Sequence, residues 1–493
     1  KKLASLLKQI YKHPLFEYLI LGVVGASSFL AFSPFDFKLI LVLTHAFLFQ
    51  SVLSSNSLLS AFKRSISWGL GYWIGGAGWL IVSVHYYGNT SIYIASIIIL
   101  LMALLLSIVF IGPISLLQKA GQCNSVFGNS ILCAGILTTI ELFRFALGGG
   151  FPWLLPGLIL TDTVTQDLLP ILGVYGGSFL IYFISIFVVM SYKKKSYKHG
   201  LLWICFLLIF YPHTGYKKIP LEGGMDIAII QPSLDPFKKY QDTYQTAIED
   251  ALINLSKIES NVDLLVWPES PLPYLNSSQQ MNRLLERTNK YPMILSGGWE
   301  YNNGKLQNVM GILGSDETYA KRHLVMFGEY VPFESIFRGI IEFFDMPMSN
   351  VTAGAKNQEL LNIQGKKILA LICFDAAFPI SFINEAKTAD FIVNISNDTW
   401  FGSSYGPYQH LQIVRARALE LNKWIVRSTS DGISTIVDNK GTIVSKLDKG
   451  LSGVLLGKIY SQKTESYFVK IGYLIVPILS FILLILSFVI RLR

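Results

Sequence analysis

The chain has 493 residues, of which 52% are hydrophobic and only 15% are charged. This composition excludes a single soluble domain, because so much apolar surface requires lipid as its solvent. The net charge of +9 could indicate nucleic-acid binding, but most lysines and arginines flank the hydrophobic runs, where they are typical of membrane topology signals. We therefore expect an integral membrane protein without a nucleic-acid partner.

Eight apolar runs could cross a bilayer, which requires about 20 mostly apolar residues. They lie at 15–32, 39–61, 65–86, 91–117, 125–146, 168–191, 199–212 and 471–490. The first run lacks a small-residue cleavage site after a short apolar segment, so we expect it to remain as a membrane anchor. The seventh run is the shortest, and its limits are the least well defined.

Basic clusters alternate with basic-poor loops along these runs. FKRS and SYKKKSYKHG are two of the clusters, and HYYGNTS is a basic-poor loop. Because Lys and Arg are enriched in cytoplasmic loops, both termini should be cytoplasmic and the long segment between the last two spans should face outward. The sequence therefore predicts a domain with seven transmembrane helices over 1–212, an extracytoplasmic domain over 213–466, and a C-terminal transmembrane helix within 467–493.

The segment between 225 and 461 has a different pattern from the membrane part. Short β-branched runs such as MDIAIIQ and KKILALIC alternate with helical stretches such as YQHLQIVRARALELN, which predicts an inserted α/β domain. The seven histidines are scattered, and Cys373 has no Cys or His neighbour in sequence. We expect neither a metal nor another cofactor.

Three polar residues of this domain could carry chemistry, and each has a plainer interpretation. Cys373 ends an apolar strand, where a buried small hydrophobe is the better interpretation on residue type alone. Glu269, in WPES, could accept a thiol proton or could be a solvated loop glutamate. Lys321, in YAKRHLV, could stabilise a thiolate and an oxyanion or could be a surface lysine.

Together, these three motifs resemble the Glu, Lys and Cys of the nitrilase superfamily. The segments KRHLVMFGEYVPFE, ICFDAAFP and ISNDTWFGSSYGPYQHLQIVRARALE, with FLAFSPFD and GGFPWLLPG in the membrane part, narrow the resemblance to the apolipoprotein N-acyltransferase family. The resemblance implies a multi-pass α-helical membrane protein with an inserted nitrilase-like αββα sandwich. It also implies that Glu269 is the general base, that Lys321 stabilises the tetrahedral intermediate and that Cys373 is acylated.

The resemblance adds four residues from other motifs to the site. Glu329, in FGE, would be a further essential carboxylate, and Asn397 and Trp400, in SNDTWFG, would shape the acyl pocket. Trp153, in FPWL, would lie at the lipid entrance, although an interfacial aromatic belt is the plainer interpretation of a single Trp.

The sequence departs from the family pattern beside the cysteine, where Tyr and Glu are common. Phe374 lacks a phenolic hydroxyl but keeps the backbone N–H that would contribute to an oxyanion hole. Asp375 occupies the acidic position with a side chain one methylene shorter than Glu, which leaves its role open. A third departure is Met326, where proline is common.

By the same resemblance, the chain transfers a fatty-acyl group from a membrane phospholipid, through a thioester on Cys373, to the α-amino group of an apolipoprotein's N-terminal diacylglyceryl-cysteine. It would act as a monomer in the bacterial inner membrane with its catalytic domain in the periplasm. Two alternatives remain open: a membrane-tethered nitrilase-type amidase, and an inactive transport or binding protein. The apolar segment 333–348 either rests in the bilayer interface or forms a buried helix.

Overall fold

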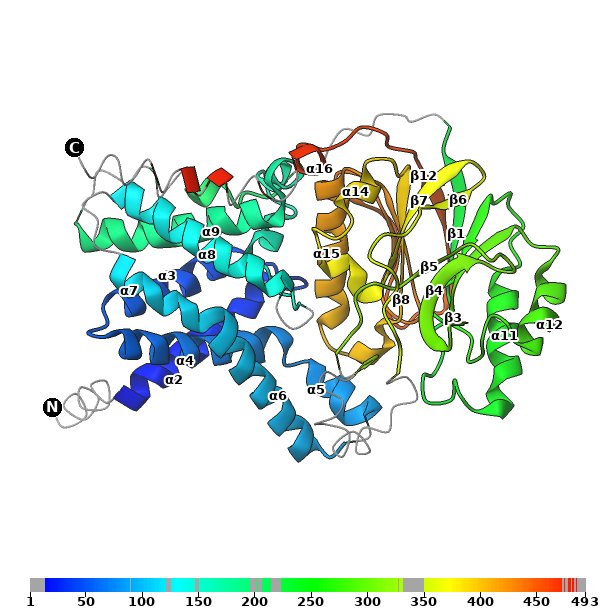
Figure 1. Cartoon of the computed structure of the whole chain (residues 1–493), viewed down its shortest axis with the longest axis horizontal. Coiled ribbons are helices and arrows are strands. Elements are labelled where there is room, and N and C mark those ends of the chain that lie inside the picture. The colour runs from blue at the N-terminus through cyan, green and yellow to red at the C-terminus, as the bar shows by residue number, and fades with distance from the viewer. Residues whose placement is uncertain are drawn as a thin grey trace. The chain divides into compact units, whose positions relative to one another are not determined.

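The computed structural model describes residues 14–470 and scattered residues of 471–485. The exceptions within 14–470 are 89, 121–125, 147–149, 196–201, 203–205, 214–222, 327 and 331–349. The chain folds as two compact units (Figure 1). The helical unit comprises Lys1–Ile81, Ser91–Thr214 and Ile471–Arg493 in so far as these are described, and the sandwich unit comprises Val82–Thr90 and Gly215–Lys470.

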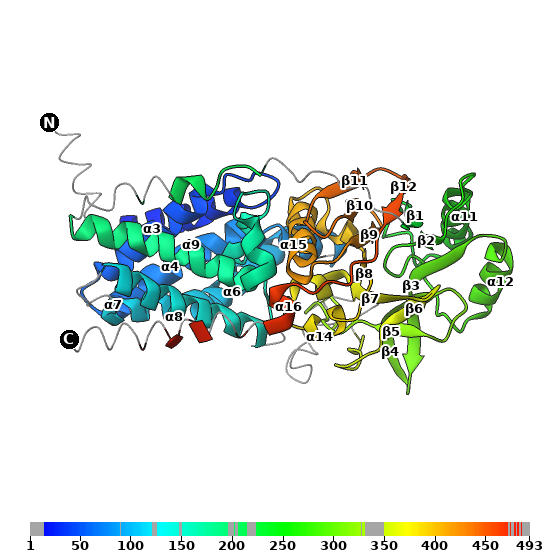
Figure 2. The same cartoon turned by 90° about the horizontal axis from the view of Figure 1, so that it is seen from above.

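The helical unit is built from long apolar helices that lie side by side (Figure 2). They are α2 (Pro14–Ser27), α3 (Leu39–Leu53), α4 (Leu58–Ala77), α6 (Ile92–Leu106), α8 (Val126–Ala146) and α9 (Leu169–Lys193). Among the described residues, three helical stretches are long and apolar enough to cross a membrane: Ile92–Lys119, Val126–Phe145 and Gln166–Lys193. Eight transmembrane helices therefore stay a prediction, and most of the 199–212 and 471–490 runs lies outside the described residues.

One predicted span, 39–61, is divided between two helices. Helix α3 ends at Leu53, and α4 begins at Leu58 after the polar residues SSNS. The reason is local hydrogen bonding, since the Ser57 hydroxyl accepts a hydrogen bond of 3.2 Å from the Ser60 N–H and caps the new helix. Serine and asparagine side chains form hydrogen bonds with nearby backbone groups and can thereby interrupt a helix. The prediction of one span over 39–61 counted only apolar residues and ignored this effect.

Two six-stranded sheets form the centre of the sandwich unit. The first has the order β12 (Gly453–Ile459), β1 (Met225–Gln231), β2 (Leu264–Val266), β3 (Met293–Asn302), β4 (Lys305–Ile312), β5 (Thr318–Ala320). The second has the order β11 (Ile443–Leu447), β10 (Ser434–Val437), β9 (Ile425–Thr429), β8 (Phe391–Ser396), β7 (Lys366–Ile372), β6 (Leu361–Ile363). In each sheet three neighbouring strands are parallel, β1–β2–β3 and β7–β8–β9. Their continuous apolar runs suit strands that are buried on both faces.

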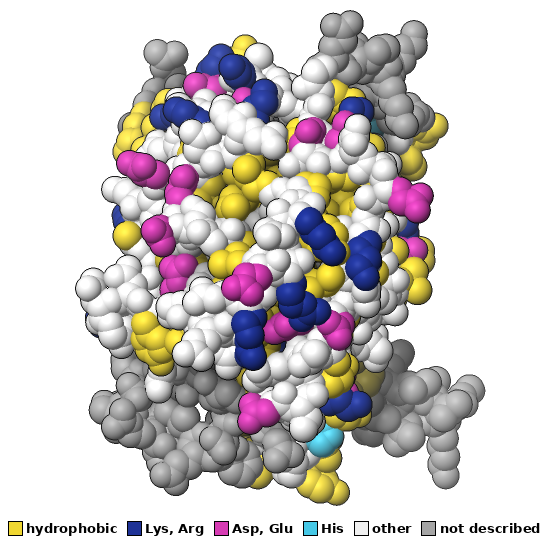
Figure 3. All heavy atoms as spheres, turned by 90° about the vertical axis from the view of Figure 1, so that its right-hand side faces the viewer, with side chains coloured by type: hydrophobic (Ala, Val, Ile, Leu, Met, Phe, Trp, Pro, Cys, Tyr) yellow, Lys and Arg dark blue, Asp and Glu magenta, His cyan; other side chains and the backbone are white. Residues whose placement is uncertain are grey.

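Helices cover both outer faces of the paired sheets (Figures 1 and 2). Helices α11 (Gln245–Leu255) and α12 (Gln279–Thr288) lie on one side, and α14 (Ile383–Ala386) and α15 (Gly406–Leu421) on the other. The face over α11 and α12 carries scattered side chains of both charges, as expected of a solvated surface (Figure 3). This layering is the nitrilase-like αββα sandwich that the family resemblance implies.

A short segment far from the rest of the sandwich in sequence completes this unit. Val82–Thr90, which precedes α6, packs on the loop that follows β8. The Ser83 hydroxyl donates a hydrogen bond of 2.7 Å to the Trp400 carbonyl. The Tyr87 ring stacks on Phe237 at 5.1 Å and meets the Trp400 ring edge-on at 5.0 Å.

Candidate active site

Cys373 lies at the carboxyl end of the parallel strand β7, at the first residue of the 3₁₀ turn Cys373–Ala377. Its φ of 49° is in the left-handed region that non-glycine residues seldom adopt. Such a conformation is costly and persists where surrounding contacts hold it. Burial raises the pKa of the thiol, and the nearby carboxylate of Glu269 raises it further, while Lys321 opposes this shift. A thiolate here therefore depends on a partner that takes its proton.

Glu269 is buried three residues after the end of β2 and accepts three hydrogen bonds. Its Oε1 accepts from Asn308 Nδ2 at 2.7 Å and from Lys321 Nζ at 3.1 Å. Its Oε2 accepts from the Asn397 backbone N–H at 2.8 Å. Glu269 is thus not a solvated loop glutamate, because it is buried and both of its carboxylate oxygens are held in place.

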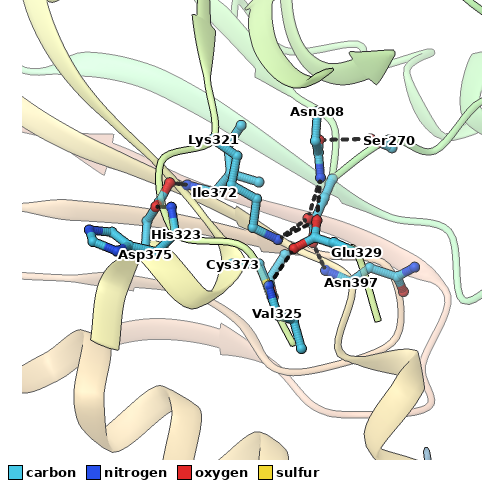
Figure 4. Close-up of polar contacts among 12 residues, drawn as sticks. Ser270, Asn308, Lys321, His323, Val325, Glu329, Ile372, Cys373, Asp375 and Asn397 are labelled. Atoms are coloured by element: carbon cyan, nitrogen blue, oxygen red, sulfur yellow. Dashed lines mark hydrogen bonds and ion pairs between the residues drawn. The ribbon is translucent and has the colours of Figure 1, made fainter. Parts of the chain in front are cut away.

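Lys321 follows β5 directly and joins two carboxylates. Its Nζ lies 3.1 Å from Glu269 Oε1 and 2.8 Å from Glu329 Oε1. Burial alone would lower the pKa of this lysine, but the two carboxylates and Cys373 raise it well above its usual range. Lys321 is therefore a fixed cation, and Figure 4 shows it beside Cys373 and Glu329.

Glu329 is fixed from both ends of its carboxylate. Beside the Lys321 contact, its Oε1 accepts from Asn308 Nδ2 at 3.3 Å, and its Oε2 accepts from the Val325 N–H at 2.9 Å. Glu269, Lys321, Cys373 and Glu329 come together at one site, where Figure 4 labels the last three of these residues.

Asp375 holds the turn after Cys373 rather than contacting Lys321 directly. Its carboxylate accepts hydrogen bonds from the His323 N–H at 2.8 Å, the Ile372 N–H at 3.1 Å and the Tyr319 hydroxyl at 3.0 Å. Burial raises the pKa of Asp375 to about 6, although Lys321 and these hydrogen bonds oppose the shift. The shorter side chain is long enough for these contacts.

The other predicted residues occupy different places around the site. Asn397 contributes its backbone N–H to Glu269, and Trp400, three residues on, packs on Tyr87. The Phe374 ring meets Phe378 edge-on at 5.1 Å. Trp153 belongs to the helical unit, where it is buried and its carbonyl accepts a hydrogen bond from Arg144.

Two sets of polar residues were missed by the sequence analysis. Asn308 lies within β4 and contacts both Glu269 and Glu329. Asp398, His410 and Arg427 form a buried group behind Cys373. Asn308 and Arg427 each adjoin an apolar residue within a strand, and this was the available signal, because a buried polar group needs a partner.

The described residues contain no group of three or more His, Cys, Asp or Glu side chains that could hold a metal ion. The arrangement suits nucleophilic chemistry instead, with a thiol, a fixed carboxylate and a buried cation at one point. The amidase and the acyltransferase of the sequence analysis would both use such a set, so the rest of the chain must distinguish them.

Comparison with known proteins covers both units. The family model described as apolipoprotein N-acyltransferase N-terminal domain matches residues 24–187, and the carbon-nitrogen hydrolase model matches residues 226–467. The Apolipoprotein N-acyltransferase of Pseudomonas aeruginosa strain PAO1 is 31% identical over 460 residues, which cover 90% of this chain and 89% of the relative. The chain belongs to the apolipoprotein N-acyltransferase family.

Further relatives agree with this membership. The Apolipoprotein N-acyltransferase of Pseudomonas paraeruginosa is 30% identical over 90% of this chain and 89% of the relative. That of Haemophilus influenzae is 30% identical over 96% of this chain and 94% of the relative. The predicted family is thus confirmed, and the chain is an acyltransferase of the apolipoprotein N-acyltransferase family.

Proposed function

We propose that the chain transfers a fatty-acyl group to the N-terminus of apolipoproteins through a thioester on Cys373. Membership of the family supports the reaction, and one observation supports the mechanism. Lys321 pairs with both Glu269 and Glu329 in a buried site beside Cys373.

In the first half-reaction Glu269 takes the proton of Cys373, and the thiolate attacks the ester carbonyl of a phospholipid. Lys321 and the Phe374 backbone N–H stabilise the oxyanion that forms on the carbonyl oxygen. The carbon–oxygen bond to the glycerol then breaks, Glu269 returns the proton to the leaving oxygen, and a lysophospholipid departs. The acyl group remains on the sulfur.

In the second half-reaction the α-amino group of a diacylglyceryl-cysteine attacks the thioester carbonyl. Glu269 takes the proton that the amine loses, and the carbon–sulfur bond breaks as the amide forms. The proton passes to the sulfur, so the free thiol of Cys373 is regenerated. Because neither half-reaction oxidises or reduces a substrate, no redox cofactor is required.

Glu329 would keep Lys321 in place through both steps. Lys321 stays protonated when Glu269 takes up a proton, because the negative charge of Glu329 still stabilises the ammonium group. The oxyanion therefore meets a cation whose position does not change during the proton transfer. This division assigns Glu269 to proton transfer and Glu329 to positioning.

The setting of the site follows the predicted topology. We assign residues 1–212 to seven transmembrane helices, except for Val82–Thr90, which belongs to the sandwich unit. We assign 213–466 to a periplasmic catalytic domain and 467–493 to an eighth helix. Both substrates would then reach the site from the outer leaflet of the bacterial inner membrane, and a monomer would suffice. Asn397 and Trp400 would shape the acyl pocket, and Trp153 would lie at the lipid entrance.

Intact-mass measurement of the purified protein after incubation with phospholipid tests this function. We expect a mass increase of one acyl group on the wild type and none on Cys373→Ala. Adding a diacylglyceryl-cysteine peptide should remove the adduct and yield an N-acylated peptide. A wild type that acquires no acyl group would refute the proposal, and loss of the adduct to water alone would favour the hydrolase alternative.

A further inference from the structure

A closed set of buried hydrogen bonds surrounds the end of β7. It starts at the Leu371 carbonyl, which accepts from Asn394 Nδ2 at 3.1 Å, and Asn394 in turn accepts from Arg427. It ends at the carbonyl of Cys373, two residues from its start, which lies 3.2 Å from His410 Nε2. The side chains of this set lie on β8, β9 and α15.

Asp398 and His410 complete the set. Arg427 Nη2 donates to Asp398 Oδ2 at 2.7 Å and lies 3.1 Å from His410 Nδ1, and Ser396 donates to Asp398 Oδ1 at 2.7 Å. His410, Asp398 and Arg427 are fully buried. The absence of a side chain at Gly432 makes room for the Asp398 carboxylate, because a Cβ there would lie 2.4 Å from Asp398 Oδ2. Three buried ionisable groups therefore contribute to fixing one backbone carbonyl.

The hydrogen positions follow from the chemistry of the partners. A carbonyl oxygen can only accept, so His410 Nε2 carries the hydrogen in its contact with Cys373. Nδ1 lies 3.0 Å from Asp398 Oδ1, which accepts, and 3.1 Å from Arg427 Nη2, which donates, so Nδ1 accepts from Arg427 in a neutral ring and donates to Asp398 in a charged one. Burial and the Arg427 charge lower the pKa of His410, although Asp398 opposes the shift, which favours this neutral form.

The orientation of one peptide links this group to the reaction. The Cys373 carbonyl and the Phe374 N–H belong to one planar trans peptide, so they point in opposite directions. A donor that fixes the carbonyl from the α15 side therefore directs the N–H to the other side. Hydrogen bonding at the carbonyl also polarises the peptide and strengthens its N–H as a donor.

We propose that His410, held by Arg427 and Asp398, is a positioning residue that aims the Phe374 N–H at the oxyanion. The inference rests on the proposed thioester chemistry and adds a requirement to it. It also explains why Cys373 keeps a left-handed φ of 49°, because the Leu371 and Cys373 carbonyls are held by side chains of β8 and α15. His410 touches no substrate in this mechanism.

Two reactions of the Cys373 thiol can distinguish a misoriented Phe374 N–H from a general disturbance of the site. Acylation by a phospholipid ester develops an oxyanion, whereas alkylation by iodoacetamide displaces iodide from a saturated carbon and develops none. The full-length protein in phosphatidylethanolamine micelles should be compared as wild type, His410→Met and His410→Gln, with the Cys373 peptide followed by mass. The glutamine amide can restore a donor near the position of Nε2.

We expect His410→Met to acylate Cys373 roughly 100-fold more slowly, as on loss of one oxyanion donor, with KM for the phospholipid and the alkylation rate unchanged. His410→Gln should recover most of the acylation rate. The inference would be overturned if His410→Met acylated Cys373 as fast as the wild type, or if acylation and alkylation slowed equally. It would also be overturned if His410→Gln acylated Cys373 as slowly as His410→Met. A wild type that is alkylated but never acylated would instead refute the proposed function.

Discussion

Lys321 Nζ lies 3.1 Å from Glu269 Oε1, and only 2% and 7% of these two side chains are exposed. Breaking a buried ion pair by removing one partner leaves an uncompensated charge, which typically costs about 3–5 kcal/mol in the free energy of unfolding. We therefore expect Lys321→Met to lower the free energy of unfolding by this order and to abolish the acyl adduct. Denaturant unfolding in detergent and intact mass measure the two effects.

The matched control for that variant is Lys446→Met. Lys446 pairs with Asp448 at 2.7 Å, but more than half of both side chains is exposed. Exposed pairs contribute at most about 1 kcal/mol, so this variant should keep both stability and activity. Equal unfolding of Lys321→Met and Lys446→Met would contradict the structural role given to the buried pair.

Asn308 joins the two carboxylates of the site, so its replacement should affect acylation. Asn308→Leu removes hydrogen bonds to charged groups, each of about 1.5–3 kcal/mol, which corresponds to a roughly 10- to 100-fold slower acylation. Asn308→Asp should be worse, because it adds a third carboxylate next to Glu269 and Glu329. Single-turnover acylation followed by mass gives the rates, and an Asn308→Asp faster than Asn308→Leu would contradict the account.

The titration of Asp375 should affect the acylation rate and the stability of the fold in opposite directions as pH changes. Its carboxylate accepts three hydrogen bonds around Cys373, so protonation below pH 6 should slow acylation. Its folded pKa of about 6 is raised above the usual 3.8, so the folded chain binds this proton more tightly than the unfolded chain does. The stabilisation from this group is therefore fully present below pH 3.8 and is lost as pH rises through 6.

Asp375→Asn tests this assignment, because the amide cannot ionise. Its remaining acylation should lack the acid limb near pH 6, whereas the exposed control Asp448→Asn should keep it. Acylation rates and unfolding midpoints between pH 4 and pH 8, measured for all three proteins, supply both profiles. An acid limb that persists unchanged in Asp375→Asn would assign the titration to another group.

Tyr87 should stabilise the loop that carries Trp400. Its hydroxyl donates to the Thr399 carbonyl at 2.6 Å, and its ring contacts both Phe237 and Trp400. Tyr87→Phe loses a hydrogen bond of about 0.5–1.5 kcal/mol, and Tyr87→Ala also loses two aromatic contacts of about 0.5–1.5 kcal/mol each. Proteolysis within residues 397–402 should increase in the order wild type, Tyr87→Phe, Tyr87→Ala, and equal cleavage of the two variants would contradict a role for the ring.

The residues that sequence reasoning found share one property, since each follows a strand or belongs to a recognisable motif. Glu269 and Cys373 both follow parallel strands, β2 and β7, which belong to different sheets. Their approach depends on the sandwich bringing two sheets together, and only the resemblance supplied that. The α/β pattern itself was readable from apolar runs of β-branched residues.

The residues that were missed act through tertiary contacts that leave little local signal. Asn308 and Arg427 each lie within a strand, and their partners are distant in sequence. A single histidine on a helix is more often only hydrogen-bonded, and the significance of His410 lies in which carbonyl it bonds. The break after Leu53 was missed because hydropathy counts apolar residues and not helix caps.

The place of Val82–Thr90 in the chain has a consequence for biosynthesis. A ribosome completes this segment well before it makes β1, so its partners around Trp400 do not yet exist. The Tyr87 ring can therefore contact Trp400 only after most of the sandwich has been translated. A gene fragment that begins after residue 212 would encode both sheets and the thiol, but it would yield a sandwich whose Trp400 loop lacks its neighbour from the start of the protein.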